Sequence, residues 1–209
     1  MKKILGRFFM ILGLLLVLGA AGLLGYNTWD SSRAGEESAS LLAQLELSET
    51  GKPSSDAEET EPHPVVQREM TVKTIENLDF IGYLSIPELN LELPVQDWWS
   101  YDGLQKSPGR YTGTTFTDDM TVCAHNYAAH FGRLRSLPLG AEVRFTDMDG
   151  VVWLYAVSEI TVLEPEDVLA MTEKGPEDTW GLTLFTCTPG GEQRVTVRCD
   201  RTGVVAKEA

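Results

Sequence analysis

Hydrophobic and polar positions divide the chain into three parts. An uncharged apolar run extends from Phe8 to Gly25, a polar segment follows it, and short β-type runs begin near residue 79. At about 1.5 Å per residue, a helix over the first run nearly crosses a hydrocarbon core of about 30 Å. The pattern therefore predicts one transmembrane helix at 8–26, a spacer at 27–78 and a folded domain at 79–209.

The third part consists of short strand-like runs separated by turn residues. The alternation predicts strands at 80–87, 91–95, 120–124, 142–146, 151–162, 183–186 and 194–197. Asp-Met-Asp-Gly at 147–150 has the composition of a hairpin turn, and short helical pieces are expected at 131–137 and 165–171. Many short strands indicate a mostly β domain, a barrel or a sandwich, with mainly antiparallel pairing.

Charges around the apolar run predict its orientation. Lys2, Lys3 and Arg7 precede the run, and acidic residues follow it. The positive-inside rule therefore places 1–7 in the cytoplasm and the rest of the chain outside the cell. A cleaved signal peptide is the alternative, because Gly19-Ala20-Ala21 offers small residues, but the apolar run continues past them and favours a retained signal anchor.

The spacer and the external part are acidic. Without the three N-terminal cations, 14 basic residues face 31 acidic ones, a net charge of −17. Such a domain does not attract nucleic acid by its overall field. Leucines at 41, 42 and 45 favour a short amphipathic helix over 38–47, whereas 51–61 is typical of a disordered linker, so we expect 27–78 to be an acidic extracellular stalk.

Cysteine and histidine supply the candidate chemistry. Three cysteines are too few, and odd in number, for a disulfide framework. Cys187 ends a predicted strand before a Thr-Pro-Gly-Gly loop, where a nearby cation would favour its thiolate, although a lone cysteine is often an inert buried residue. His125 follows another strand, an address typical of a general acid or base.

An arginine on the returning strand would complete the set by donating hydrogen bonds to an oxyanion, since a guanidinium cannot act as a base. Arg194 and Arg198 share one strand face, so alternation does not choose between them, but it predicts Cys199 in the core. Cys123 lies on the same strand face as His125 and is expected to pack in its strand. His130 is expected on a surface loop.

These residues resemble a known family. Thr183-Leu184-Phe185-Thr186-Cys187 matches the Thr-Leu-x-Thr-Cys signature of the sortases, the membrane-anchored cysteine transpeptidases of Gram-positive bacteria. Ala124-His125-Asn126 is similar to the family's histidine segment, and Arg194 opens the next strand as the family's arginine does. The resemblance extends from about Phe80 to Arg201 and looks closest to class B and class D members.

The resemblance implies a closed β-barrel of about eight strands with short helices. It implies cleavage of a C-terminal Leu-Pro-x-Thr-Gly-like sorting signal on secreted proteins, a thioester at Cys187, and acyl transfer to a peptidoglycan or pilin amine. Cys187, His125 and Arg194 would be catalytic, with Thr186 and Asn126 in contact with substrate, and no metal or cofactor is expected. The alternatives are another exported cysteine enzyme, such as an L,D-transpeptidase, and a non-catalytic membrane-tethered β-domain.

Overall fold

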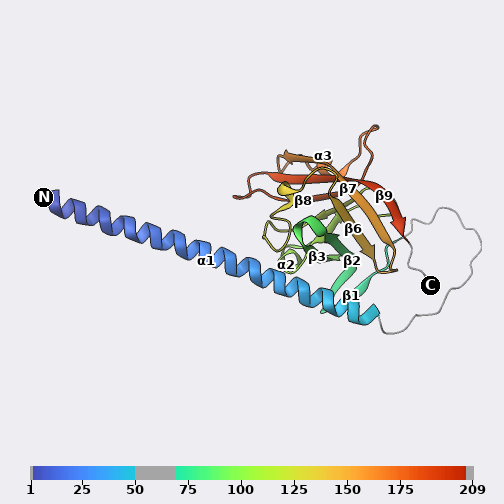
Figure 1. Cartoon of the computed structure of the whole chain (residues 1–209), viewed down its shortest axis with the longest axis horizontal. Coiled ribbons are helices and arrows are strands. Elements are labelled where there is room, and N and C mark those ends of the chain that lie inside the picture. Colours follow the sequence, from blue (N-terminus) through green and yellow to red (C-terminus); the bar gives the residue numbers. More distant parts are fainter. Residues whose placement is uncertain (1, 50–68, 206–209) are drawn as a thin grey trace, which may run out of the picture. The chain divides into compact units, whose positions relative to one another are not determined.

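The computed structural model describes residues 2–49 and 69–205 (Figure 1). A long helix, α1 (Lys2–Glu49), precedes the strands. The strands are β1 (Lys73–Ile75), β2 (Leu78–Ile86), β3 (Leu91–Gln96), β4 (Gly109–Thr112), β5 (Met120–Cys123), β6 (Glu142–Asp147), β7 (Val152–Leu163), β8 (Trp180–Cys187) and β9 (Arg194–Val205). Short helical segments are η1 (Pro87–Leu89), α2 (Tyr101–Leu104), η2 (Leu134–Ser136) and α3 (Val168–Thr172).

Eight of the strands form a closed ring. The sheet order is β1-β2-β3-β4-β5-β8-β9-β7-β6, and a further β2–β6 pairing joins its two sides, with β1 attached to β2. The closed barrel of about eight strands that the resemblance implied is therefore confirmed. Two neighbouring pairs, β3–β4 and β5–β8, are parallel and the other pairs are antiparallel, and the β5–β8 pair decides the geometry of the site below.

The barrel interior is filled by one face of each strand, as alternation requires. In β8 and β9 the inward residues are Leu182, Leu184, Val195, Val197 and Cys199, all in the main hydrophobic core. The predicted core position of Cys199 is thus confirmed.

The β2–β6 pairing that closes the ring depends on Gly82. A Cβ atom there would lie 2.2 Å from the Thr146 backbone oxygen and 2.6 Å from the Phe145 ring. Only glycine lets the two strands approach this closely.

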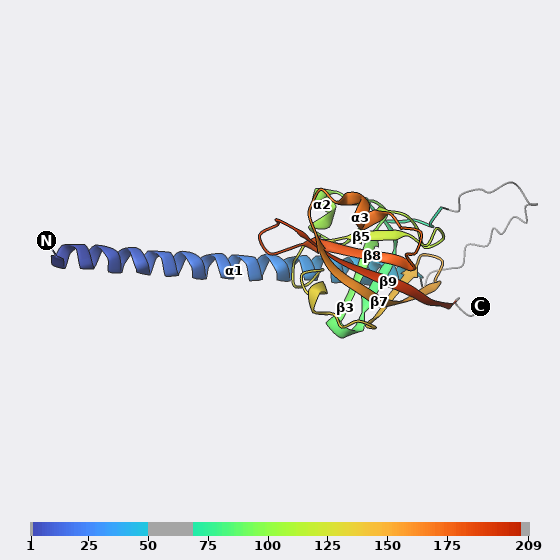
Figure 2. The ribbon, with the colours of Figure 1, turned by 90° about the horizontal axis from the view of Figure 1, so that it is seen from above.

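A second apolar cluster covers the outer face of β5 and β8. It consists of Leu104, Cys123, Met171 and Phe185, with Trp99, Tyr111, Leu163 and Val168 packed against it. Figure 2 shows β5, β8, β9 and β7 side by side, with α2 and α3 above β5. Side chains from α2, α3 and β7 therefore cover the outer face near the end of β8.

The chain divides into two compact units, Met1–Arg33 and Ala34–Ala209. Within the first, α1 is long and apolar enough to cross a membrane, with a mean hydropathy of 2.5 in its most apolar window. The second unit begins well before the predicted domain start at residue 79, which falls inside β2.

The reason for this earlier boundary is the last part of α1. Ala34, Ser38, Leu41, Leu42 and Leu45 form one buried helix face. Leu41 and Leu45 pack with Phe80 of β2, so the expected helix over 38–47 exists but belongs to the folded domain rather than to a free stalk. The predicted linker at 51–61 lies outside the described residues.

Candidate active site

His125 and Cys187 lie at neighbouring strand ends because β5 and β8 run parallel. Their register pairs Cys123 with Phe185, and the backbone N–H of Ala124 still donates to the Phe185 carbonyl at 3.3 Å. Two residues further along each chain, His125 and Cys187 stand at the same level on the same outer face. Both side chains are partly exposed, and they lie 62 residues apart in sequence.

The β8–β9 hairpin places an arginine next to Cys187, so that His125, Cys187 and Arg194 form a row across neighbouring strand ends. Its register pairs Cys187 with Arg194, and β7 continues the row with Leu163, the partner of Arg194. Arg198 instead pairs with Thr183, four residues back along β8, or about 13 Å at about 3.3 Å per residue. Strand register therefore separates two arginines that alternation could not distinguish.

The hydrogen-bond partners of the two guanidinium groups also distinguish Arg194 from Arg198. Arg194 Nη1 donates to the backbone carbonyls of Gly191 and Gln193, at 3.0 and 3.1 Å, so the group is held at the mouth of the hairpin loop. Arg198 forms an ion pair with Glu159 at 2.9 Å and donates to the Ala170 carbonyl at 2.6 Å. Arg198 thus links β9 to β7 and α3.

The loop between Cys187 and Arg194 is short and internally bonded. Thr188 N–H donates to the Gln193 carbonyl at 2.9 Å, and Gly191 N–H donates to the Thr188 carbonyl at 2.8 Å. Gly190 and Gly191 have φ angles of 94° and 82°, a region that favours glycine. This geometry keeps the strand ends that carry Cys187 and Arg194 close together.

Asn126 and Thr186, the two residues expected to contact substrate, differ in their exposure to solvent. Asn126 is exposed and its Nδ2 donates to the Thr188 carbonyl at 3.3 Å, which ties the histidine loop to the hairpin loop. Thr186 points to the barrel interior, is 3% exposed, and donates to the Ala124 carbonyl at 2.8 Å. The Thr186 side chain therefore braces the ends of β5 and β8 and does not line the outer face.

The other two cysteines have environments unsuited to nucleophilic attack. All three cysteines are free thiols. Cys123 packs on the outer face beside Phe185, where burial, and to a smaller extent the nearby Cys187, raise its pKa to about 12. Burial also strongly raises the pKa of Cys199. The expectation that Cys123 packs in its strand is confirmed, and both groups stay protonated near neutral pH.

His130 is the residue that sequence reasoning placed wrongly. It is fully buried rather than on a surface loop, and its Nε2 lies 2.9 Å from Ser38 Oγ of α1. Burial lowers its pKa to about 4, with His125 a further, smaller cause in the same direction. The partner on α1 lies 92 residues earlier in the chain, so no local pattern around His130 could have indicated its burial.

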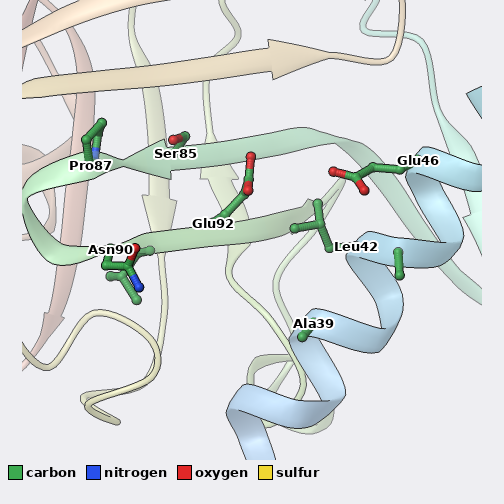
Figure 3. Close-up of a pocket in the computed structure, with 9 residues that line it drawn as sticks. Ala39, Leu42, Glu46, Ser85, Pro87, Asn90 and Glu92 are labelled. Carbon is green, nitrogen blue, oxygen red and sulfur yellow. The ribbon is translucent and has the colours of Figure 1, made fainter.

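A hollow of about 500 Å³ lies elsewhere, between α1 and the β2–β3 hairpin. Figure 3 shows Ala39, Leu42 and Glu46 of α1 on one side and Ser85, Asn90 and Glu92 on the other. Neither Cys187, His125 nor Arg194 lines it, so the hollow is separate from the row of candidate residues.

A closed barrel with a cysteine, a histidine and an arginine at neighbouring strand ends, after a helix apolar enough to cross a membrane, is an arrangement suited to cysteine acyl transfer. The sortase domain family model matches residues 84–202, more than half of the chain. The chain belongs to the sortase family of cysteine transpeptidases, and the L,D-transpeptidase alternative is thereby excluded. Curated protein sequences gave no match.

Solved sortase structures are similar over the folded domain. Sortase C1 from Streptococcus suis is 30% identical, with a TM-score of 0.53 over 62% of this chain and 76% of that one. Sortase C from Clostridium perfringens SM101 is 27% identical, with a TM-score of 0.51 over 60% and 71%. Sortase A from Corynebacterium diphtheriae is 25% identical, with a TM-score of 0.54 over 63% and 64%. Resemblance to class B or class D members stays a prediction.

Proposed function

We propose that the chain is a transpeptidase that cleaves a Leu-Pro-x-Thr-Gly-like sorting signal and transfers the acyl group to an amine of peptidoglycan or a pilin. Cys187 is the nucleophile, His125 the general acid and base, and Arg194 the oxyanion donor. The observation that carries the proposal is the row of these three residues across β5, β8 and β9.

The reaction proceeds in two acyl transfers. The Cys187 thiolate attacks the scissile carbonyl, and an Arg194 N–H stabilises the oxyanion that develops there. The C–N bond then breaks, His125 donates a proton to the leaving amine, and a thioester remains on Cys187. The acceptor amine attacks the thioester and loses a proton to His125, and the C–S bond breaks to release the Cys187 thiolate.

The surroundings of the row suit an extended peptide with an apolar residue. Phe185, Leu163 and Met171 lie in the outer-face cluster beside Cys187, and Leu163 pairs directly with Arg194. An aliphatic side chain N-terminal to the scissile bond can be buried against this cluster. Asn126 and the Thr188 carbonyl, which directly follow His125 and Cys187 in sequence, supply polar groups near the row.

The same proposal places the protein in the cell membrane. The apolar part of α1 crosses the bilayer once, with the three N-terminal cations in the cytoplasm and the barrel outside. Secreted proteins that carry a sorting signal then reach the barrel on the side where the cell wall amines are found.

The test is single-turnover reaction of the full chain with a Leu-Pro-x-Thr-Gly peptide library, read by mass spectrometry of the thioester. We expect the acyl adduct on Cys187 and its loss in Cys187→Ala, whereas Cys123→Ala, which removes a neighbouring buried thiol, keeps it. We also expect a methanethiosulfonate reagent to label Cys187 in the native protein and to stop turnover. Labelling of Cys187 only after denaturation, or an adduct that persists in Cys187→Ala, would contradict the proposal.

A further inference from the structure

The loop that follows β5 rests on α1. Residues 125–132 turn tightly, with the His130 N–H donating to the Tyr127 carbonyl at 2.9 Å and the Phe131 N–H donating to the His125 carbonyl at 3.2 Å. Phe131 is fully buried in the barrel core and anchors the end of this turn. Between these anchors, the His130 side chain leaves the barrel and meets the helix.

Ser38 is a polar residue on the otherwise mostly apolar buried face of α1, and it is 1% exposed. Its hydroxyl donates to the Lys106 carbonyl and lies 2.9 Å from His130 Nε2. A hydroxyl has one proton, so when that proton is given to Lys106, the Ser38 oxygen must accept from His130. The contact therefore places a proton on His130 Nε2, and the burial that lowers the pKa of His130 to about 4 keeps the ring neutral at pH 7.

Three aromatic rings connect this contact to the candidate general acid. The centroids of the His125 and Tyr127 rings are 5.2 Å apart, and those of Tyr127 and His130 are 5.5 Å apart. A displacement of the His130 ring therefore moves the surface against which Tyr127, and through it His125, is packed.

The backbone of α1 also touches the loop directly. A Cβ atom on Gly35 would lie 2.9 Å from the Ala129 Cβ, closer than such atoms approach. The helix and the loop thus meet at two neighbouring points, one apolar contact at Gly35 and one hydrogen bond at Ser38.

We propose that Ser38 and His130 are positioning residues that hold the His125 imidazole through Tyr127, so that catalysis depends on α1 being seated on the barrel. This inference rests on the proposed function, because it assigns His125 the proton transfers. The contact joins the domain's own helix to the active-site loop, and a change in the seating of α1 changes the rate of the chemical step.

Kinetics of the full chain test the inference. We expect Ser38→Ala to lower kcat by about 10-fold or more, within the loss of about 10²-fold that a small misplacement of a reacting group can cause. The peptide KM should stay within about 2-fold, because Ser38 is buried and its loss affects the proton transfers rather than peptide binding. Ser40→Ala, the same change on the exposed side of α1, is the matched control and should match the unmodified chain.

Two further variants separate positioning from folding. His130→Gln keeps an amide N–H near the place of Nε2–H and should restore most of the kcat that His130→Leu loses. Gly35→Ala raises helix propensity, so it should not weaken α1, yet its methyl group displaces the Ala129 loop and should lower kcat. If these variants lower activity only as far as they lower the thermal midpoint, the positioning role is refuted.

Nuclear magnetic resonance of the histidine rings gives a readout that does not need turnover. We expect His130 to carry its proton on Nε2 at pH 7, and the titration of His125 to shift in Ser38→Ala but not in Ser40→Ala. If the unmodified chain lacks transpeptidase activity but this shift is seen, the proposed function fails and the contact stands. An unchanged His125 titration in Ser38→Ala overturns the inference, whatever the activity.

Discussion

Replacing Arg194 or Arg198 of β9 by alanine should have opposite effects on activity and on stability. Arg194 pairs with Cys187, so Arg194→Ala removes the proposed oxyanion donor, and we expect kcat/KM to fall by about 10² to 10³, or about 2.7–4 kcal/mol. Arg194 donates to two carbonyls of a short loop, so the thermal midpoint should change little.

Arg198→Ala should do the reverse. It removes an ion pair to the half-exposed Glu159 and a hydrogen bond to the Ala170 carbonyl, together about 1–3 kcal/mol of folding free energy. For a domain of this size the thermal midpoint should fall by about 3 to 10 °C. Because Arg198 lies about 13 Å from Cys187 along the strand, kcat/KM measured well below that midpoint should change less than about 3-fold.

The assay is single-turnover thioester formation with the sorting-signal peptide, paired with a thermal melt of each variant. Equal losses of kcat/KM in the two variants at temperatures where both are folded would refute the assignment of Arg194. A severe loss of kcat/KM confined to Arg198→Ala would assign the oxyanion donor to Arg198 instead.

Three other predictions follow from burial and close contact. At neutral pH a methanethiosulfonate reagent should modify Cys187 and spare Cys123, because Cys123 is buried and its raised pKa keeps it protonated. Peptide mapping would identify the modified cysteine. Gly82→Ala should lower the unfolding free energy by more than about 2 kcal/mol in urea, whereas Gly203→Ala, with room for a methyl group, should cost about 1 kcal/mol or less. Folding lowers the pKa of His130 from 6.5 to about 4, so between these pH values the unfolded chain binds more protons than the folded one. The free energy of unfolding should therefore fall by up to about 3 kcal/mol from pH 7 to pH 4. In His130→Gln this loss should be smaller.

The strands and their inward faces could be predicted from local patterns. Alternation identified β2, β3, β5, β6 and β7 nearly to their ends, because one face of each strand is buried in the core. The pattern missed β1 (Lys73–Ile75), three residues inside the predicted spacer, and β4 (Gly109–Thr112), four mostly half-buried residues, because strands this short show no clear alternation.

Cys187 and His125 could be identified as candidates because a residue's position at a strand end is a local property. The choice between Arg194 and Arg198 needed the pairing of β8 with β9, since period two gives both the same face and only register fixes the neighbour. The sequence did not show that the side chain of Thr186 donates to the Ala124 carbonyl, and its contact with substrate stays a prediction.

The sequence by itself determined that the chain has an apolar N-terminal helix, a mostly β domain and two residues suited to acyl transfer, because each of these follows from composition or from short-range periodicity. Tertiary structure alone decided that His125, Cys187 and Arg194 form one row, and that Ser38 of α1 meets His130. Contacts between residues 62 or 92 positions apart depend on how whole elements pack and pair, and local patterns do not carry that information.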